Sequence, residues 1–486
     1  MTVVLGELTP SLRDLRSRSL DGRSVAVSRE ILADLDTPVS AYLKLRAEGG
    51  SFLLESAEGG ERIGRYSFVG TRPRRTVRVK DRRQRWVTGD ESACDDPLAA
   101  ARAIVEAYSP VDRSRAPFEG GALGYLSYEA ARYFERIPSA AADPLDLPDA
   151  AFMDVDTVLI FDHIARRTRV VSHVRLDQPL DRAYREAEER IEEVLCRLNR
   201  PVAGAPDPPS GVPAPRSNLD PRRFQDMVLA GKEHIAAGDI LQVVLSQRLA
   251  IPLPSDAFGL YRRLRTVSPA PYMYYLDFGD HQIVGASPEL LVEARDGAVF
   301  TRPIAGTRPR GRTEAEDARL AEELLADEKE RAEHLMLVDL ARNDVGRVSA
   351  PGTVSVRDFM KVERFSHVMH LVTDVSGTLD AGRTAYDALR AAFPAGTVSG
   401  APKIRAMEII AELEPDRRGP YAGAVGFINT GGEMEMAITI RTGVVKNGTL
   451  FLQVGAGIVA DSDPERELGE TMNKARALLA AAGVTL

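Results

Sequence analysis

The segments 366–378, SHVMHLVTDVSGT, and 393–400, FPAGTVSG, combine two histidines with a loop of glycine, threonine and serine. Two further segments carry paired acids. Residues 328–344 read EKERAEHLMLVDLARND, and residues 455–474 read GAGIVADSDPERELGETMNK. We expect the rest of the chain to be a scaffold that brings these four segments together.

The composition is that of a soluble globular protein, with 44% hydrophobic and 28% charged residues. A formal net charge of -8 argues against nucleic-acid binding as the main role, and the basic run 72–85 is typical of a solvated strand face. No run approaches the ~18 apolar residues needed to cross a bilayer, and the N-terminus is no signal peptide. Cys94 and Cys196 are far apart, which fits a reducing, cytoplasmic location. Neither nucleic acid nor a membrane is therefore an expected partner.

The clearest boundary lies at 200–217, RPVAGAPDPPSGVPAPRS, which is rich in proline, glycine and alanine. Such a segment is typical of a connector. With 486 residues, two domains are expected, and we predict an N-terminal domain 1–199 and a C-terminal domain 218–486. Strand-like segments cluster between helices without steady alternation, which predicts an α+β fold in layers. The charged segment 313–342 predicts one long helix.

Glu330 and Glu333 are three residues apart on this predicted helix, so they share one face, and Glu467 and Glu470 do the same on the last predicted helix. Two such pairs could hold one hard cation through oxygen, as Mg²⁺ prefers. The alternative is that both pairs lie on solvated, charge-rich helix faces.

His367 and His370 are also three apart. Zinc binding is disfavoured because no third ligand stands at a suitable spacing. Acid/base chemistry by one of them is the functional interpretation, and a hydrogen-bonded core histidine is the alternative.

The glycines of 396–403, which run into a predicted helix at Pro402, leave N–H groups free for a carboxylate or phosphate. The segment Gly455-Ala456-Gly457, expected to follow a strand, offers similar donors. Arg441 ends the apolar run MAITIR, where a guanidinium could meet a carboxylate. Glu289 and Gln242 are polar residues in apolar strands, and each alone could be structural.

Taken together, these segments resemble the chorismate-utilising enzymes, and most closely the anthranilate synthase component I family. The resemblance is strong from Asp220 to the C-terminus, and SFLLES with RYSFVG extends it toward the N-terminus. The motifs that carry it are PIAGTRPRG at 303–311, EHLMLVDLARND at 333–344, HVMHLV at 367–372, FPAGTVSGAPKIRAMEII at 393–410, GPYAGAVGF at 419–427 and the segment 455–474. The fold it implies has large antiparallel sheets packed in layers, with helices outside.

The resemblance also implies roles for individual residues. Glu333 and Glu470 would ligate Mg²⁺, with Glu330 and Glu467 in support. Glu289 would be the general acid for the departing C4 hydroxyl, and His370, rather than His367, would assist the later loss of pyruvate. Thr397 would line the catalytic pocket. The residues that would hold chorismate are Gly306, Thr307, Tyr421, Arg441, Gly455, Ala456, Gly457 and Lys474.

The implied reaction is the amination of chorismate with ammonia followed by elimination of pyruvate to give anthranilate, the first step of tryptophan biosynthesis. Relatives that add water resemble this chain but have a lysine where Gln242 stands, and aminodeoxychorismate synthases have a lysine where Ala305 stands. Both differences favour anthranilate. The alternatives are an aminodeoxychorismate synthase component I and a non-catalytic, tryptophan-responsive regulatory subunit.

Two further features follow from the resemblance. Neither cysteine lies in a glutaminase motif, so a separate glutamine amidotransferase subunit would supply ammonia from glutamine. LLES and PYM resemble a feedback site for L-tryptophan, while the alternative is a core strand and an aromatic packing segment. The residues of this effector site would be Leu54, Glu55, Ser56, Pro271, Tyr272 and Met273.

Overall fold

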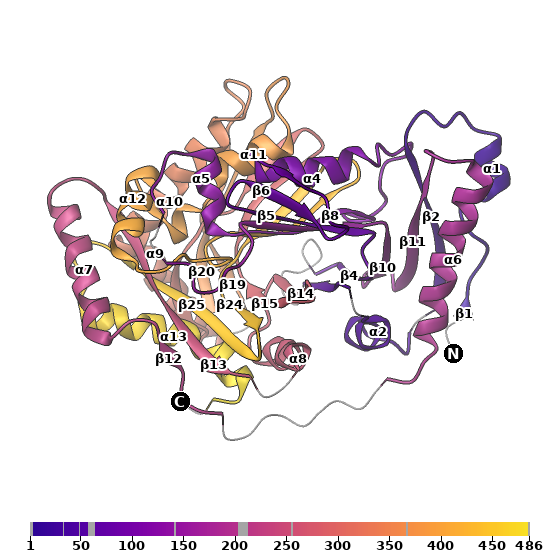
Figure 1. Cartoon of the computed structure of the whole chain (residues 1–486). Coiled ribbons are helices and arrows are strands. Elements are labelled where there is room, and N and C mark those ends of the chain that lie inside the picture. The colour runs from indigo at the N-terminus through magenta and orange to yellow at the C-terminus, as the bar shows by residue number, and fades with distance from the viewer. Residues whose placement is uncertain are drawn as a thin grey trace.

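The computed structural model describes residues 3–32, 34–47, 49–56, 64–139, 142–202, 212–253, 256–365 and 368–484. Across these residues the backbone forms two large antiparallel sheets with helices on their outer faces (Figure 1). This arrangement confirms the α+β layers expected from the sequence. Half of the predicted connector, residues 203–211, lies outside the described residues, as do Ser366 and His367.

The first sheet has 13 strands among the described residues. In spatial order they are β1 (Val3–Val4), β2 (Ser24–Leu32), β11 (Arg167–Arg175), β10 (Thr157–Asp162), β4 (Tyr66–Thr71), β3 (Ser51–Glu55), β14 (Tyr272–Asp277), β15 (His281–Ser287), β24 (Thr442–Lys446), β25 (Thr449–Ile458), β13 (Gln242–Pro252) and β12 (Arg216–Ser217), with β21 (Gly400–Ala401) also paired to β13.

The second sheet has 12 strands within the same described ranges. In spatial order they are β18 (Ile304–Pro309), β20 (Val368–Thr378), β17 (Ala298–Thr301), β16 (Leu290–Arg295), β23 (Met434–Ile438), β22 (Ala424–Asn429), β8 (Gly121–Leu126), β9 (Ala150–Val155), β5 (Arg75–Lys80), β6 (Arg83–Trp86) and β7 (Glu91–Ala93), with β19 (Ser355–Arg364) paired to β20.

Both sheets contain strands from both sides of the predicted connector. In the first sheet β3 pairs with β14, so that Glu55 lies opposite Met273. In the second sheet β8 pairs with β22. The two sequence segments thus share their sheets, and their division into two domains stays a prediction.

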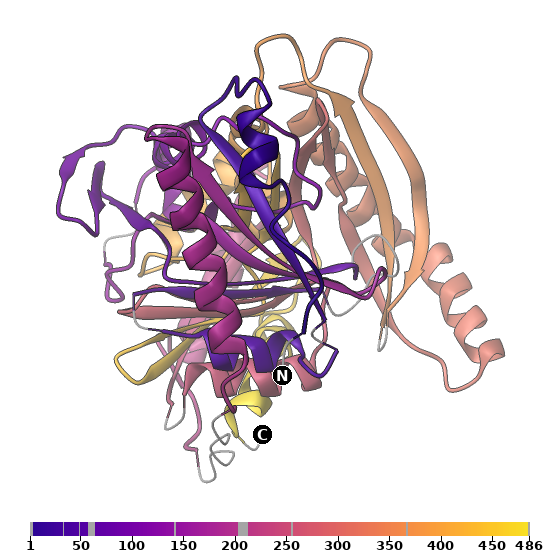
Figure 2. The ribbon, with the colours of Figure 1, turned by 90° about the vertical axis from the view of Figure 1, so that its right-hand side faces the viewer.

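The helices cover the outer faces of the sheets, and Figure 2 shows one of them, α6, lying over β2 and β11. Their bounds are α1 (Leu12–Arg16), α2 (Pro38–Leu45), α4 (Pro97–Glu106), α5 (Ala131–Phe134), α6 (Leu180–Leu198), α7 (Pro221–Ala236), α8 (Ala257–Val267), α9 (Glu314–Ala326), α10 (Glu328–Gly346), α11 (Ala385–Ala392), α12 (Lys403–Leu413) and α13 (Pro464–Ala482), with short 3₁₀ turns η1 (Tyr128–Ala130) and η2 (Gly396–Val398). No described helix is long and apolar enough to span a membrane.

An aromatic core fills the space between the two sheets. Phe52 and Phe68 come from the first sheet and Phe427 from the second. The ring of Phe118 lies 4.9 Å from that of Phe427 and 6.2 Å from that of Phe52, distances at which aromatic pairs add to the stabilisation from burial. This core joins the sheets and closes one side of the cavity described below.

Two local predictions were wrong. The segment 313–342 is two helices, because Asp327 leaves the helical conformation and its carboxylate accepts hydrogen bonds from the N–H groups of Lys329 and Glu330. The Gly455-Ala456-Gly457 segment lies inside β25 rather than after it. Its backbone groups are therefore paired with β13 along one edge.

Candidate active site and adjoining cavity

The carboxylate pair on α10 lies within electrostatic range of the pair on α13. Burial raises the pKa of Glu333, and the charges of Glu330 and Glu470 raise it further. Glu467 has a raised pKa for the same two reasons, burial first and then Glu470. The charge of Glu470 on α13 thus acts on Glu333 of α10 as well as on Glu467, and a cation site shared by the two pairs stays a prediction.

Basic side chains hold two of these acids. Lys474 Nζ lies 2.7 Å from Glu470 Oε1 and donates to the carbonyl of Gly455 at 3.0 Å. Arg308 Nη1 lies 3.2 Å from Glu330 Oε1. Among the described residues no three acidic, histidine or cysteine side chains are in metal-binding geometry. The donor set still suits a hard divalent cation, which would offset the repulsion that raises the pKa of Glu333.

Glu289 is the buried acid of the site, with 8% of the residue exposed. Burial raises its pKa to about 8, while the Thr397 hydroxyl and the Arg441 guanidinium lower it. Thr397 Oγ1 lies close to this carboxyl, but it has no hydrogen-bond partner of ordinary geometry in the described chain. Glu289 therefore holds a proton near neutrality, as a general acid must.

Arg441 lies in the turn between β23 and β24, with φ at 50°. Non-glycine residues rarely adopt this region, and such strain is often found at functional sites. Burial lowers the pKa of the guanidinium and Glu289 raises it, although the residue as a whole is exposed. An accessible cation beside a protonated acid suits a carboxylate ligand.

His370 lies on β20 and is oriented by β18. Its Nδ1 lies 2.7 Å from the carbonyl oxygen of Gly306 and 3.2 Å from Thr307 Oγ1. A carbonyl can only accept, so Nδ1 carries the proton and Nε2 is the basic nitrogen. Burial lowers the pKa of His370, the bond to Gly306 opposes this, and Arg441 lowers the pKa further. The ring is therefore neutral at pH 7 and able to take a proton.

One wall of the site is formed by β25. A Cβ atom on Gly455 would lie 2.6 Å from the hydroxyl of Tyr421, and one on Gly457 would lie 2.6 Å from Gln242 Nε2. Glycine is needed at both positions because neighbouring groups come this close to the strand. Ala456 between them is fully buried. Burial raises the pKa of Tyr421 to about 12, so its hydroxyl stays a donor.

Gln242 faces this wall from β13 and is 4% exposed. Its Oε1 atom has no hydrogen-bond partner among the described residues. A buried carbonyl oxygen without a partner is costly, so Gln242 offers an acceptor to whatever binds beside β25.

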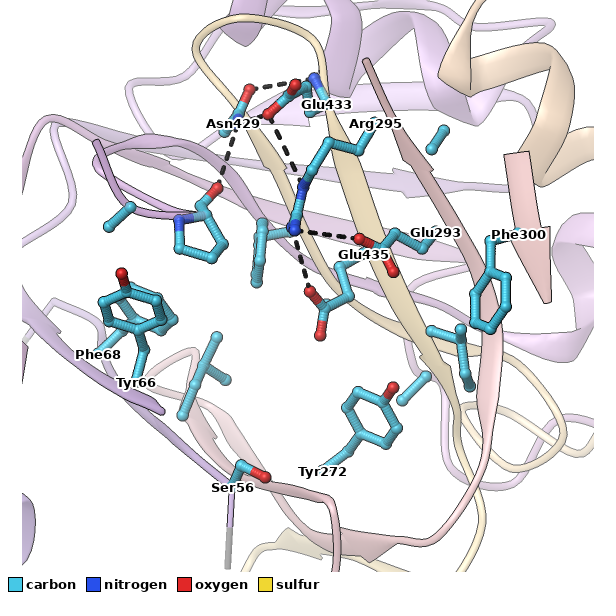
Figure 3. Close-up of a pocket in the computed structure, with 18 of the residues that line it drawn as sticks. Ser56, Tyr66, Phe68, Tyr272, Glu293, Arg295, Phe300, Asn429, Glu433 and Glu435 are labelled. Atoms are coloured by element: carbon cyan, nitrogen blue, oxygen red, sulfur yellow. Dashed lines mark hydrogen bonds and ion pairs between the residues drawn. The ribbon is translucent and has the colours of Figure 1, made fainter. Parts of the chain in front are cut away.

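A separate cavity of about 1310 Å³ lies between the two sheets (Figure 3). All six residues predicted to form an effector site line it: Leu54, Glu55, Ser56, Pro271, Tyr272 and Met273. The pairing of β3 with β14 brings these two segments side by side.

The six residues do not contribute in the same way. The Glu55 carboxylate accepts a hydrogen bond from the Tyr261 hydroxyl at 2.6 Å and pairs with Arg265 at 3.1 Å, both on α8. Met273 packs in the core between the first sheet and its helices, whereas Leu54 and Tyr272 pack toward the space between the sheets. The alternation of a β-strand explains the division.

The far wall of the cavity holds charged residues that the sequence reasoning missed. Arg295 lies 3.1 Å from Glu293, 3.6 Å from Glu435 and 4.0 Å from Glu433 (Figure 3). Burial raises the pKa of Glu435 to about 7, and Glu293 raises it further. The signal was present as charged residues two apart, Glu293 and Arg295 on β16 and Glu433 and Glu435 at the start of β23, but alternation of this kind is common on solvated strands.

Comparison with known proteins agrees with this geometry. A family model described as chorismate binding enzyme matches residues 49–480. The anthranilate synthase component 1 of Thermus thermophilus is 51% identical over 458 residues, which cover 93% of this chain and 96% of that one. The corresponding protein of Aquifex aeolicus is 46% identical over 486 residues, with 98% of each chain covered.

Solved structures give the same result. The crystal structure of anthranilate synthase component I from Streptococcus pneumoniae matches with a TM-score of 0.78 and 37% identity, covering 92% of this chain and 98% of that one. The menaquinone-specific isochorismate synthase of Escherichia coli matches with a TM-score of 0.71 at 19% identity, covering 98% and 99%, which shows a shared fold.

Proposed function

The chain belongs to the chorismate-binding enzymes, and on that premise we propose that it is the large subunit of an anthranilate synthase, a lyase that makes anthranilate and pyruvate from chorismate and ammonia. The observation that carries the proposal is the grouping of a protonated acid, a neutral histidine and an accessible arginine, Glu289, His370 and Arg441. The high identity to proteins of that name over nearly the whole chain supports it.

Chorismate carries two carboxylates, so its site must supply positive charge and hydrogen-bond donors. Arg441 and Lys474 supply charge, and the Tyr421 hydroxyl and the backbone around Gly455 to Gly457 supply polar contacts. Gly306 and Thr307 line the side that holds His370. These roles for the residues are proposals based on their placement.

A divalent cation, proposed to be Mg²⁺, would be held by Glu333 and Glu470, with Glu330 and Glu467 beside them. When bound, such an ion neutralises carboxylate charge on the substrate. The carboxylate oxygens of these helices suit Mg²⁺, which binds one or two protein carboxylates and an anionic ligand.

The acid and the base act at different atoms. Glu289 protonates the C4 hydroxyl as ammonia attacks C2, so a C–N bond forms, the C4–O bond breaks and water leaves. His370 Nε2 then removes the proton at C2 while the C3–O bond breaks. The released enolpyruvate takes up a proton to become pyruvate, and the ring becomes aromatic.

Two positions support ammonia as nucleophile and anthranilate as product. The Gln242 amide is not basic and cannot activate water, while its free Oε1 can accept a hydrogen bond from ammonia. Ala305 offers no amine for a covalent adduct, which disfavours an aminodeoxychorismate synthase. A non-catalytic regulatory subunit is disfavoured because the acid, the histidine and the arginine lie together.

A glutamine amidotransferase subunit is the proposed source of ammonia, and the cytoplasm is the proposed location, which suits the free Cys94 and Cys196. We propose L-tryptophan as the ligand of the cavity between the sheets, inhibiting the enzyme. Ser56 and Tyr272 lie on one side of that cavity and the charged group around Arg295 on the other (Figure 3).

Product analysis tests the proposal. The purified chain is incubated with chorismate, MgCl₂ and an ammonium salt, and the products are separated and identified by mass. Anthranilate and pyruvate in equal amounts are expected. Glutamine in place of ammonium should give neither. Aminodeoxychorismate as the final product, or no consumption of chorismate, would refute the proposal.

A further inference from the structure

The site wall is supported from behind by a buried charge pair that none of the steps above uses. Glu414 is the C-cap of α12 and Arg418 lies in the loop that follows, with side chains 3% and 1% exposed. Arg418 donates to both Glu414 oxygens, from Nε at 2.8 Å and from Nη2 at 2.6 Å. The Arg418 guanidinium also packs against the rings of Tyr128 and Tyr421, at 4.7 and 5.6 Å from their centroids.

The remaining donors of Arg418 reach two backbone carbonyls in different elements. Nη1 donates to Val398, which follows Thr397 in η2, at 2.8 Å. Nη2 donates to Val244 at 2.7 Å, and Val244 lies opposite Gly457 in the sheet. One planar group thus sets the spacing between the Thr397 loop and the β25 wall.

Glu414 fixes the same strands from its other side. Its Oε1 accepts from the backbone N–H of Ser246 at 2.7 Å and from the Ser246 hydroxyl at 2.8 Å. Ser246 lies opposite Gly455. The pair therefore touches the strand positions opposite both site glycines.

Stability alone is a poor explanation for such a pair. Removing two ions from water costs several kcal/mol each, and apolar replacements of buried pairs are often neutral or stabilising. What an apolar pair cannot do is donate to the two carbonyls. The Arg418 guanidinium donates in a fixed plane, which suits the holding of several acceptors at set positions.

We propose that Arg418, held by Glu414, is a positioning residue for chorismate binding. It keeps η2, β25 and the Tyr421 ring at the separation that the substrate requires. This proposal rests on the proposed function only for the identity of the substrate. The direct consequence, a fixed geometry of the wall, belongs to the chain itself.

The test uses a variant that removes both charges without leaving either unpaired. Arg418→Met with Glu414→Gln retains an acceptor for Ser246 but leaves the carbonyls of Val398 and Val244 without the guanidinium. The matched control is Arg169→Met with Glu119→Gln, a pair 3.2 Å apart in the N-terminal half whose side chains are 15% and 5% exposed. Arg418→Lys, which keeps the positive charge but not the planar guanidinium with its several donors, is the conservative variant.

For the double variant we expect the KM for chorismate to rise about tenfold or more, a loss equal to about 1.4 kcal/mol. The kcat and the KM for ammonia should change much less, and the melting temperature should match that of the control. Amide hydrogen exchange, measured without substrate, should become faster in 396–400 and 455–458. Arg418→Lys should lie between the wild type and the double variant.

Unchanged exchange in these two segments would overturn the proposal, as would equal effects in the control pair. A parallel fall in kcat and melting temperature without a change in KM would mean a structural role only and would also overturn it. If the wild type does not consume chorismate, the proposed function fails separately, and the exchange data still decide whether Arg418 fixes the wall.

Discussion

The cavity between the sheets and the carboxylate site between α10 and α13 are assembled in opposite ways. The cavity takes its shape from strand register, with β3 against β14 on one side and β16 against β23 on the other. On its charged wall one cation, Arg295, pairs with three acids, and burial and the charge of Glu293 raise the pKa of Glu435. The carboxylate site is instead formed by side chains of two helices, where Lys474 and Arg308 pair with Glu470 and Glu330. Burial and repulsion together raise the pKa of Glu333 there.

The difference indicates what each region needs from a ligand. A cavity defined by backbone pairing is formed before anything binds, so it suits an effector that selects a shape. Acids that repel one another would be drawn together by a cation, so the proposed metal and substrate would complete the geometry of the carboxylate site. The two regions should therefore fail independently when mutated, and the predictions below run from the largest expected effect to the smallest.

Glu289→Gln should give the largest loss. The variant keeps a polar side chain but has no proton for the C4 hydroxyl, so kcat for anthranilate should fall by about 10² to 10⁴. Anthranilate fluorescence measures this, with Glu293→Gln on the cavity wall as the control. Tryptophan binding to Glu289→Gln, measured by calorimetry, should match that of the wild type.

The pH profile sharpens the same prediction. The pKa of Glu289 is raised to about 8, so the acid form is present below pH 8 and disappears as the pH rises through it. With unprotonated ammonia held constant, wild-type kcat/KM should fall on the alkaline side of about pH 8. A wild-type profile flat to pH 10, or a variant with most of its activity, would exclude Glu289 as the acid.

Glu333→Gln should reduce activity by more than about 100-fold, because it removes a proposed metal ligand. Even residues that only hydrogen-bond to a metal ligand contribute about 10- to 100-fold. Activity measured against MgCl₂ concentration should show a higher metal requirement. The control is Glu465→Gln, an exposed acid in the first turn of α13, the helix that carries the other proposed ligand, Glu470. Equal metal dependence in variant and wild type would refute the assignment.

Ser56→Phe should act on the cavity alone. The phenyl ring is larger than the serine side chain and occupies space near Tyr272. The tryptophan concentration for half inhibition should therefore rise at least about tenfold, which is 1.4 kcal/mol of binding free energy. The uninhibited rate should stay unchanged. Ser92→Phe, at an exposed position on β7, is the control. Undiminished inhibition would remove Ser56 from the effector site.

Thr307→Val should have the smallest effect. It removes the hydroxyl 3.2 Å from His370 Nδ1, but the bond to the Gly306 carbonyl remains. A single hydrogen bond of this kind contributes about 0.5–1.5 kcal/mol, so kcat should fall about 2- to 10-fold. Steady-state kinetics at saturating chorismate measure it. A loss as large as that of Glu289→Gln would mean that Thr307 contacts the reacting atoms.

The sequence predicted individual helices better than the contacts between distant segments. Local patterns placed the helix that follows the 396–403 loop and the last helix, which carries Glu467 and Glu470, because helical spacing is a local signal. Both acid pairs lie on helices, α10 and α13, as expected. The break at Asp327 was missed because the residues on both sides of it are typical of a helix. The Asp327 carboxylate instead caps the start of α10 and ends the preceding helix.

Contacts between segments far apart in the sequence could not be predicted from local patterns. Nothing in the segments around Arg295 and Glu435 shows that their strands are neighbours, since β16 and β23 are far apart in sequence. The same is true of Arg418, whose partners Val244 and Val398 come from two other elements. The resemblance to a known family supplied the catalytic roles, which spacing alone left open.

The most direct test of two separate sites is a calorimetric titration of L-tryptophan into Glu333→Gln and into Ser56→Phe, with anthranilate formation measured in parallel. The account predicts that Glu333→Gln binds tryptophan as the wild type does but makes almost no anthranilate, while Ser56→Phe makes anthranilate but binds tryptophan weakly. Loss of both properties in either folded variant would contradict it.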